Sequence, residues 1–123
     1  MPSILQNHYV LAVHNLDTNA VFLEKLGFQV VNKPDGWIFL QKDNCMIMLG
    51  ECKNATFASE LGDHSYFAYL RVDDVDAYYR DIKKKHVSTF DEPSTKPWQM
   101  REFGLRLPEG HRLTIGQWMD VAE

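Results

Sequence analysis

The sequence is short of cysteine, with only Cys45 and Cys52 among its 123 residues. No Cys-x-x-Cys pair is present, which argues against a zinc site built from thiolates. No basic segment followed by an apolar one opens the chain, and no apolar run approaches the roughly 18 residues that a membrane-spanning helix needs. We therefore expect a cytoplasmic protein with reduced thiols and no membrane partner.

An excess of basic residues is also absent. The chain has 13 Lys and Arg residues against 17 Asp and Glu residues, which gives a formal net charge of −4. Proteins that bind nucleic acid usually carry basic surfaces, so we expect no nucleic-acid partner. An acidic chain suits a cationic small molecule slightly better than an anionic one. The hydrophobic fraction of 45% and the length favour one globular domain over residues 1–123.

The chain contains an internal repeat at an offset of 59 residues. Segment 11–17, Leu-Ala-Val-His-Asn-Leu-Asp, resembles segment 70–76, Leu-Arg-Val-Asp-Asp-Val-Asp. Apolar residues then follow at i, i+4 and i+7 in both halves, which predicts one amphipathic helix in each. Asp17 and Asp76 lie at the expected helix starts, where carboxylates are favourable. The apolar positions are Leu16, Ala20 and Leu23 in the first half, and Val75, Tyr79 and Ile82 in the second.

Strands are predicted around both helices, in the order β-α-β-β-β in each half. One helix can cover only one face of such a sheet. The sequence therefore predicts an α+β fold with two βαβββ modules, whose sheets form a concave half-barrel trough with the helices outside. The expected modules span about residues 5–50 and 63–118, with a linker at 51–62 and a proline-containing loop at 91–98. The expected strands are 8–14, 28–32, 37–41 and 45–49, then 65–72, 87–90, 101–106 and 111–117.

The paired modules, each with a Leu-x-Val-x-Asp-Val-Asp style entry to its helix, resemble the vicinal-oxygen-chelate superfamily over about residues 7–118. This superfamily includes glyoxalases, extradiol dioxygenases and bleomycin-resistance proteins. A narrower resemblance to the bleomycin-resistance proteins rests on Lys-Pro-Trp-Gln-Met-Arg-Glu-Phe at 96–103, Pro-Glu-Gly-His at 108–111 and Gly-Trp-Ile-Phe-Leu-Gln at 36–41. The chain departs from the family at Leu107, where Asp is usual, and at His86, where Gly is usual.

The resemblance also implies where a metal would bind. Enzymes of this superfamily hold a divalent metal through the first and fourth strands of each half. Counting along the repeat places His8 and Phe67 at the first-strand positions, and Met48 and Thr114 at the fourth-strand positions. Phenylalanine, methionine and threonine are poor ligands for such an ion. We therefore predict no metal, no cofactor and no catalytic residues of the superfamily's kind.

Strand parity indicates what the trough offers instead. Phe67 and Tyr69 share one parity, Trp37 and Phe39 share another, and Trp98 follows the proline-containing loop. Flat apolar side chains suit a planar or amphiphilic ligand, and the carboxylate of Glu102 would attract a cationic group. Packing of Trp37 and Phe39 on the helix remains an alternative, so the parity of strands 37–41 and 101–106 is open. The predicted ligand contacts are Trp98, Phe67, Tyr69, Trp37, Phe39, Met48, Glu102, His8 and Thr114.

These residues favour a non-catalytic protein that binds a cationic or aromatic small molecule, such as one that sequesters a bleomycin-type antibiotic. In bleomycin-resistance proteins the groove lies between two subunits, so the resemblance implies a homodimer. Two alternatives stay open at this point. One is a vicinal-oxygen-chelate enzyme, namely a lyase, dioxygenase or isomerase of unknown substrate. The other is an interaction module that binds a peptide or protein partner.

Overall fold

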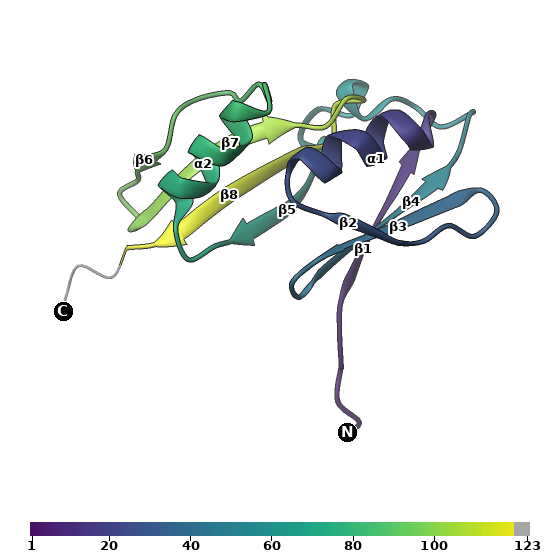
Figure 1. Cartoon of the computed structure of the whole chain (residues 1–123), viewed down its shortest axis with the longest axis horizontal. Coiled ribbons are helices and arrows are strands. Elements are labelled where there is room, and N and C mark those ends of the chain that lie inside the picture. The colour runs from purple at the N-terminus through teal and green to yellow at the C-terminus, as the bar shows by residue number, and fades with distance from the viewer. Residues whose placement is uncertain (120–123) are drawn as a thin grey trace.

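The computed structural model describes residues 1–119, which form two modules of one helix and one four-stranded sheet each (Figure 1). In each sheet the first and fourth strands are parallel neighbours, and the remaining pairs are antiparallel. The sheets have the orders β1-β4-β3-β2 and β5-β8-β7-β6. Module 1 contains β1 (His8–Val13), α1 (Leu16–Lys25), β2 (Gln29–Asn32), β3 (Trp37–Lys42) and β4 (Cys45–Glu51). Module 2 contains β5 (Tyr66–Arg71), α2 (Val75–Lys84), β6 (Ser94–Thr95), β7 (Met100–Arg106) and β8 (Arg112–Trp118).

The predicted α+β class with two βαβββ modules is confirmed. Both sheets are open, and within residues 1–119 no strand of one sheet pairs with a strand of the other. In the same residues, neither helix is both long and apolar enough to cross a membrane.

The two helices begin as the repeat predicts. Asn15 caps α1 by accepting a hydrogen bond from the N–H of Thr18 at 2.9 Å, and Asp74 caps α2 through the N–H of Ala77 at 3.0 Å. Each cap satisfies one of the N–H groups that a helix start leaves without an intrahelical partner.

The two helices also end at equivalent positions. Gly27 follows α1 with φ of 100°, and His86 follows α2 with φ of 62°. These positions are 59 residues apart, and both lie in the left-handed region that terminates many helices. A glycine adopts this backbone conformation without steric cost, whereas His86 adopts it with a side chain that disfavours it.

The prediction of a strand at residues 87–90 is wrong. Val87 closes the helix instead, because its N–H bonds to the carbonyl of Ile82 at 3.2 Å. Phe90 then donates to the carbonyl of Gly104 at 2.8 Å, but the carboxylate of Asp91 accepts the N–H of Gly104 and interrupts a main-chain ladder. The short strand β6 lies further along, inside the expected loop 91–98. The expected linker 51–62 likewise includes the last residue of β4 and a 3₁₀ helix, Ala58–Glu60.

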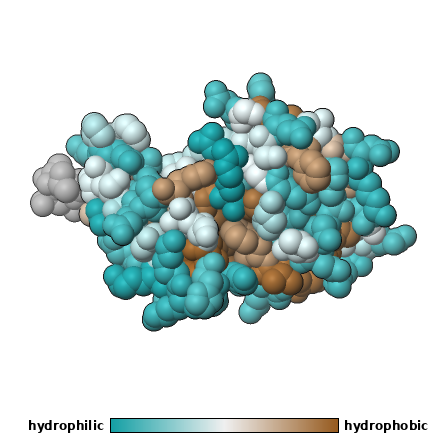
Figure 2. Space-filling model, turned by 90° about the horizontal axis from the view of Figure 1, so that it is seen from above, coloured by the Kyte–Doolittle hydropathy of each residue, from teal (hydrophilic) through white to brown (hydrophobic). Residues whose placement is uncertain are grey.

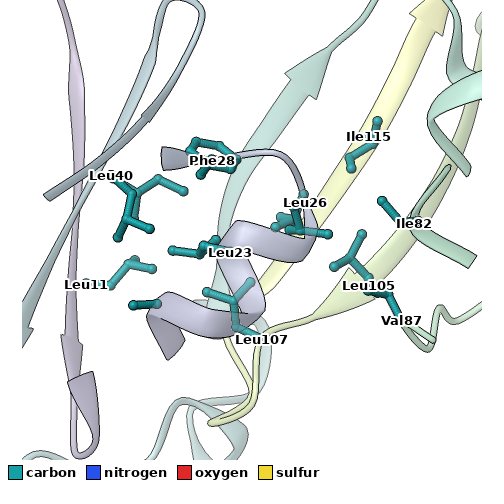
Figure 3. Close-up of a cluster of buried hydrophobic side chains, with 14 of the residues drawn as sticks. Leu11, Leu23, Leu26, Phe28, Leu40, Ile82, Val87, Leu105, Leu107 and Ile115 are labelled. Atoms are coloured by element: carbon teal, nitrogen blue, oxygen red, sulfur yellow. The ribbon is translucent and has the colours of Figure 1, made fainter. Parts of the chain in front are cut away.

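Both modules contribute to one cluster of buried side chains. Figure 3 shows Leu23 of α1 and Leu26, which follows this helix, between Leu40 of module 1 and the module 2 residues Leu105 and Ile82. Leu23, Leu40 and Leu105 are fully buried. Burial of such a side chain contributes about 1.5–3 kcal/mol relative to exposure, so the shared cluster holds the two modules together.

A carboxylate links module 2 to the start of α1. Glu109, in the turn between β7 and β8, accepts the main-chain N–H of His14 at 2.8 Å and that of Asn15 at 3.0 Å. It also accepts the side-chain amide of Asn19 at 2.9 Å. In the opposite direction, the hydroxyl of Tyr78 on α2 donates to the main-chain carbonyl that follows α1. These contacts, together with the shared core, couple the two modules.

Candidate functional site

Each sheet has one face without a helix, which we call its open face. In module 1, Ile38 and Leu40 of β3 are 3% and 0% exposed in the core. Side chains alternate along a strand, so Trp37 and Phe39 lie on the open face and not against the helix. Met48 is the ladder partner of Phe39, which places it on the same face.

Aromatic and sulfur groups cover the open face of module 1. The ring of Trp37 lies over Gly50, since a Cβ atom at that glycine would stand 2.8 Å from the ring. Trp37 and Phe39 meet edge to face, with their ring centres 6.0 Å apart. Next to them, Nδ1 of His8 lies 3.3 Å from Sδ of Met48. Four of the predicted ligand contacts therefore share this face.

Three further predicted contacts lie on the open face of module 2. Leu113 and Ile115 of β8 are buried in the core, so Thr114 between them lies on the open side. Tyr69 is the ladder partner of Thr114. Its hydroxyl donates to Oε2 of Glu102 on β7 at 2.6 Å, across the intervening strand. Tyr69, Glu102 and Thr114 therefore form one group.

A glycine makes the contact between Tyr69 and Glu102 possible. A Cβ atom at Gly116 would stand only 2.0 Å from the hydroxyl oxygen of Tyr69. Partial burial, followed by the hydrogen bond and the negative charge of Glu102, raises the pKa of Tyr69 well above its usual value. The phenol therefore stays protonated at neutral pH and orients the carboxylate. Oε1 of Glu102 has no hydrogen-bond partner among residues 1–119, so it is available to a ligand.

The expected shared parity of Phe67 and Tyr69 is wrong. The pairing of β5 with β8 is irregular between Tyr66 and Ala68, so one residue there is out of step with the alternation. Phe67 packs against the core, where its ring contacts Tyr9 edge to face at 5.8 Å. Tyr66, and not Phe67, shares the open face with Tyr69.

Trp98 lies beyond the open face of module 2, in the turn between β6 and β7. Its side chain is 59% exposed. The turn is closed by a hydrogen bond from the N–H of Gln99 to the carbonyl of Lys96 at 2.9 Å. The predictions missed Trp118, which pairs with Met100 near this turn and is 49% exposed. Because Trp118 follows Thr114 at an even offset along β8, strand alternation would have placed Trp118 on the same face as Thr114.

The donor set does not fit the metal that the superfamily's enzymes hold. Among the four predicted positions, only His8 supplies a good ligand for a divalent ion, and its neighbour Met48 offers a thioether. Phe67 packs in the core and has no donor atom, and the neutral hydroxyl of Thr114 is a poor ligand for such an ion. Within residues 1–119, no group of three or more His, Cys, Asp or Glu side chains is arranged to hold a metal ion.

A separate cavity of about 280 Å³ lies where the β3–β4 hairpin approaches β5 and α2. Tyr9, Phe28 and Tyr78 contribute to its walls, together with Cys45. Burial raises the pKa of the Cys45 thiol. Of the predicted ligand contacts, only Tyr69 borders it. We therefore locate the candidate site on the open faces, where seven of the nine predicted ligand contacts lie, Trp37 and Phe39 among them. Figure 2 shows that one side of the molecule is mostly hydrophilic, with hydrophobic residues gathered near its centre.

Within one chain, seven of the nine predicted ligand contacts thus form two groups. His8, Trp37, Phe39 and Met48 belong to the open face of module 1, and Tyr69, Glu102 and Thr114 to that of module 2. No hydrogen bond or aromatic contact between described residues joins the two groups. Each group therefore covers one wall of a potential site.

The family model for the Glyoxalase/Bleomycin resistance protein/Dioxygenase superfamily matches residues 5–115. The chain therefore belongs to this superfamily. Among solved structures, it is similar to a bleomycin-binding protein complexed with bleomycin, with 26% identity, a TM-score of 0.74 and coverage of 91% of this chain and 97% of that one. It is equally similar to a bleomycin resistance determinant encoded on the transposon Tn5, with 26% identity, a TM-score of 0.75 and coverage of 91% and 96%.

A glyoxalase/bleomycin resistance protein/dioxygenase from Nocardioides shares the fold, with 14% identity, a TM-score of 0.72 and coverage of 98% of this chain and 87% of that one. No curated protein sequence matches the chain.

Proposed function

We propose that this chain is a non-catalytic binding protein that sequesters a cationic, aromatic small molecule of the bleomycin type. The observation that carries the proposal is the Tyr69–Glu102 pair, which holds a carboxylate on a sheet face with one acceptor oxygen free. A carboxylate beside aromatic rings attracts an organic cation through both charge and cation–π contacts. The similarity to a bleomycin-binding protein and a bleomycin resistance determinant supports this ligand class.

The proposal includes a homodimer in which the open face of module 1 from one copy meets the open face of module 2 from the other. The separation of the predicted contacts into two groups supports this arrangement, because one chain supplies each wall once. Trp98 would then close one end of the groove. The two free thiols, Cys45 and Cys52, fit the cytoplasmic location that we also propose.

Isothermal titration with metal-free bleomycin tests the ligand. Wild-type protein is expected to bind it. Glu102→Gln keeps an acceptor for Tyr69 but removes the charge, so it should weaken binding about tenfold, as expected for loss of one charge-assisted contact. The matched control is Glu24→Gln, an exposed position on α1, which should leave the affinity unchanged. Equal affinity of Glu102→Gln and wild type would refute the proposed role of the carboxylate.

Two further measurements test the rest of the proposal. Light scattering coupled to gel filtration should give twice the 14.3 kDa mass of the chain, and a monomer would exclude the groove between copies. Elemental analysis of protein purified without chelators should find no stoichiometric transition metal. A stoichiometric metal would favour the enzyme alternative, in which a bound ion polarises a substrate oxygen.

A further inference from the structure

The open face of module 2 carries two arginines at the end away from Trp98. Arg106 on β7 and Arg112 on β8 are direct partners in the antiparallel ladder. Their neighbours Leu105 and Leu113 are buried, so both arginines lie on the open side. Like charges directly opposite each other in a ladder are destabilising. A pair of this kind in a chain of net charge −4 calls for a specific explanation.

Two aromatic rings alternate with the two arginines. Phe90, from the loop after α2, lies over Gly104, where a Cβ atom would stand 3.1 Å from its ring. Its ring centre is 5.1 Å from Cζ of Arg106 and 5.9 Å from Cζ of Arg112. Tyr66 stands 5.6 Å from Cζ of Arg112. We call Tyr66, Phe90, Arg106 and Arg112 the arginine clamp.

Few protein acceptors satisfy the guanidinium groups of the clamp. Arg106 donates through Nη1 to the carbonyl of Gly110 at 3.2 Å. Arg112 has one carboxylate within reach among the described residues, that of Asp63 at 4.0 Å, and this side chain is fully exposed. Such a surface pair contributes little. The aromatic rings therefore fix the orientation of guanidinium groups whose other N–H donors make no hydrogen bond to residues 1–119.

We propose that the arginine clamp binds the carboxylate of a planar aromatic acid. A guanidinium group held in place by a ring presents its N–H donors as a fork, which matches a carboxylate in a bidentate contact. The ring of the acid would pack against Phe90 in an offset or edge-to-face arrangement. Because the clamp shares the open face with Glu102, the proposal deepens the proposed function and rests on it: the natural ligand carries an anionic aromatic group in addition to its cation.

Isothermal titration at low ionic strength tests the clamp with 1-naphthoate, its neutral amide 1-naphthamide, acetate and inorganic phosphate. Naphthoate should bind wild-type protein at least about tenfold more tightly than each of the others, since it alone combines the charge with the ring. Added salt should weaken this binding. Equal binding of naphthamide would show that the charge is irrelevant, and equal binding of phosphate would show a general oxyanion site. Either result would overturn the proposal.

Variants then assign the site. Arg106→Gln and Arg112→Gln should each weaken naphthoate binding about tenfold, while Arg80→Gln, an exposed position on α2, should have no effect. If a glutamine variant does not fold, Arg112→Lys decides the question, because it keeps the charge but loses the fork. It should weaken binding about threefold. Wild-type affinity in Arg112→Lys and Arg106→Gln together would refute the clamp.

The outcome of this experiment is separable from that of the bleomycin titration. If bleomycin does not bind but naphthoate binding requires both arginines, the proposed function fails and the anion site stands. If bleomycin binding requires Glu102 and naphthoate does not bind, the clamp alone is refuted. Glu102→Gln should not weaken naphthoate binding, because removal of a nearby negative charge cannot disfavour an anion.

Discussion

The contact between Glu109 and the start of α1 gives the sharpest stability prediction. Glu109→Ala removes the acceptor of two main-chain N–H groups and one side-chain amide. Net contributions of hydrogen bonds to charged groups are about 1.5–3 kcal/mol each, and partial exposure lets water replace some of them, so we expect a loss of about 3 kcal/mol in the free energy of unfolding. For a chain of this length, that loss corresponds to a decrease of about 10 °C in Tm.

The pH dependence of this contact provides a second, independent readout. Burial raises the pKa of Glu109. The hydrogen bonds from the N–H groups of His14 and Asn15 and from the amide of Asn19 together lower this pKa by more than burial raises it, so the pKa lies below the ordinary 4.5. The resulting stability is present at neutral pH and is lost as the pH falls through the pKa of the folded protein. The difference in unfolding free energy between wild type and Glu109→Gln should therefore shrink in acid.

Urea unfolding followed by tryptophan fluorescence measures both effects. Glu24→Gln, at an exposed position on the same helix, is the control and should change stability by less than about 0.5 kcal/mol. A loss below about 1 kcal/mol in Glu109→Ala at pH 7 would be too small for three hydrogen bonds to a carboxylate. A difference between wild type and Glu109→Gln that stayed constant down to acid pH would contradict the assignment of the lowered pKa.

Three more predictions concern single residues. Burial lowers the pKa of His111 despite the opposing charge of Glu109, so stability should fall as the pH drops through the ordinary histidine value of 6.5, and His111→Gln should flatten this dependence in urea titrations. His86→Gly should raise the unfolding free energy by about 1 kcal/mol, because glycine tolerates the left-handed backbone there; no gain would refute the strain. Gly116→Ala should displace the hydroxyl of Tyr69 and lower the free energy of unfolding by about 1–3 kcal/mol. It should also return the pKa of the Tyr69 phenol toward its usual value, which a spectrophotometric titration measures. An unchanged titration curve would contradict the contact.

The internal repeat was sufficient to predict the two helices. Equivalent helices start after Asn15 and Asp74 and are followed by Gly27 and His86 in the left-handed conformation, each pair 59 residues apart. Helix periodicity and capping are local properties, so they can be identified without knowledge of tertiary contacts. The prediction of a strand at 87–90 was wrong because strand pairing is a tertiary property. The pairing depended on which group accepts the N–H of Gly104. Asp91 does so, and no sequence pattern indicates that choice.

The candidate site was predictable only in part. Alternation along β8 predicted Thr114 on an open face. For β3 the sequence left open which face Trp37 and Phe39 occupy, and the burial of Ile38 and Leu40 decided it. The irregular pairing next to Phe67 broke the same rule in β5, because one residue out of step reverses the side on which a side chain points. Trp118 was missed because the predicted strand ended one residue before it, at 117. Phe90 was missed because its loop was expected to be a strand.

The class of fold and the two-module organisation follow from residue type, periodicity and spacing, which act over short segments. The resemblance to the superfamily implied where a metal would bind, and the residue types at those positions are unsuitable ligands. Three features became visible only in the folded chain: Tyr69 reaches Glu102 over Gly116, Glu109 links the two modules, and Arg106 and Arg112 face the same ring. Such contacts join residues far apart in the chain, and their geometry depends on sheet register, which one residue of slip would reverse.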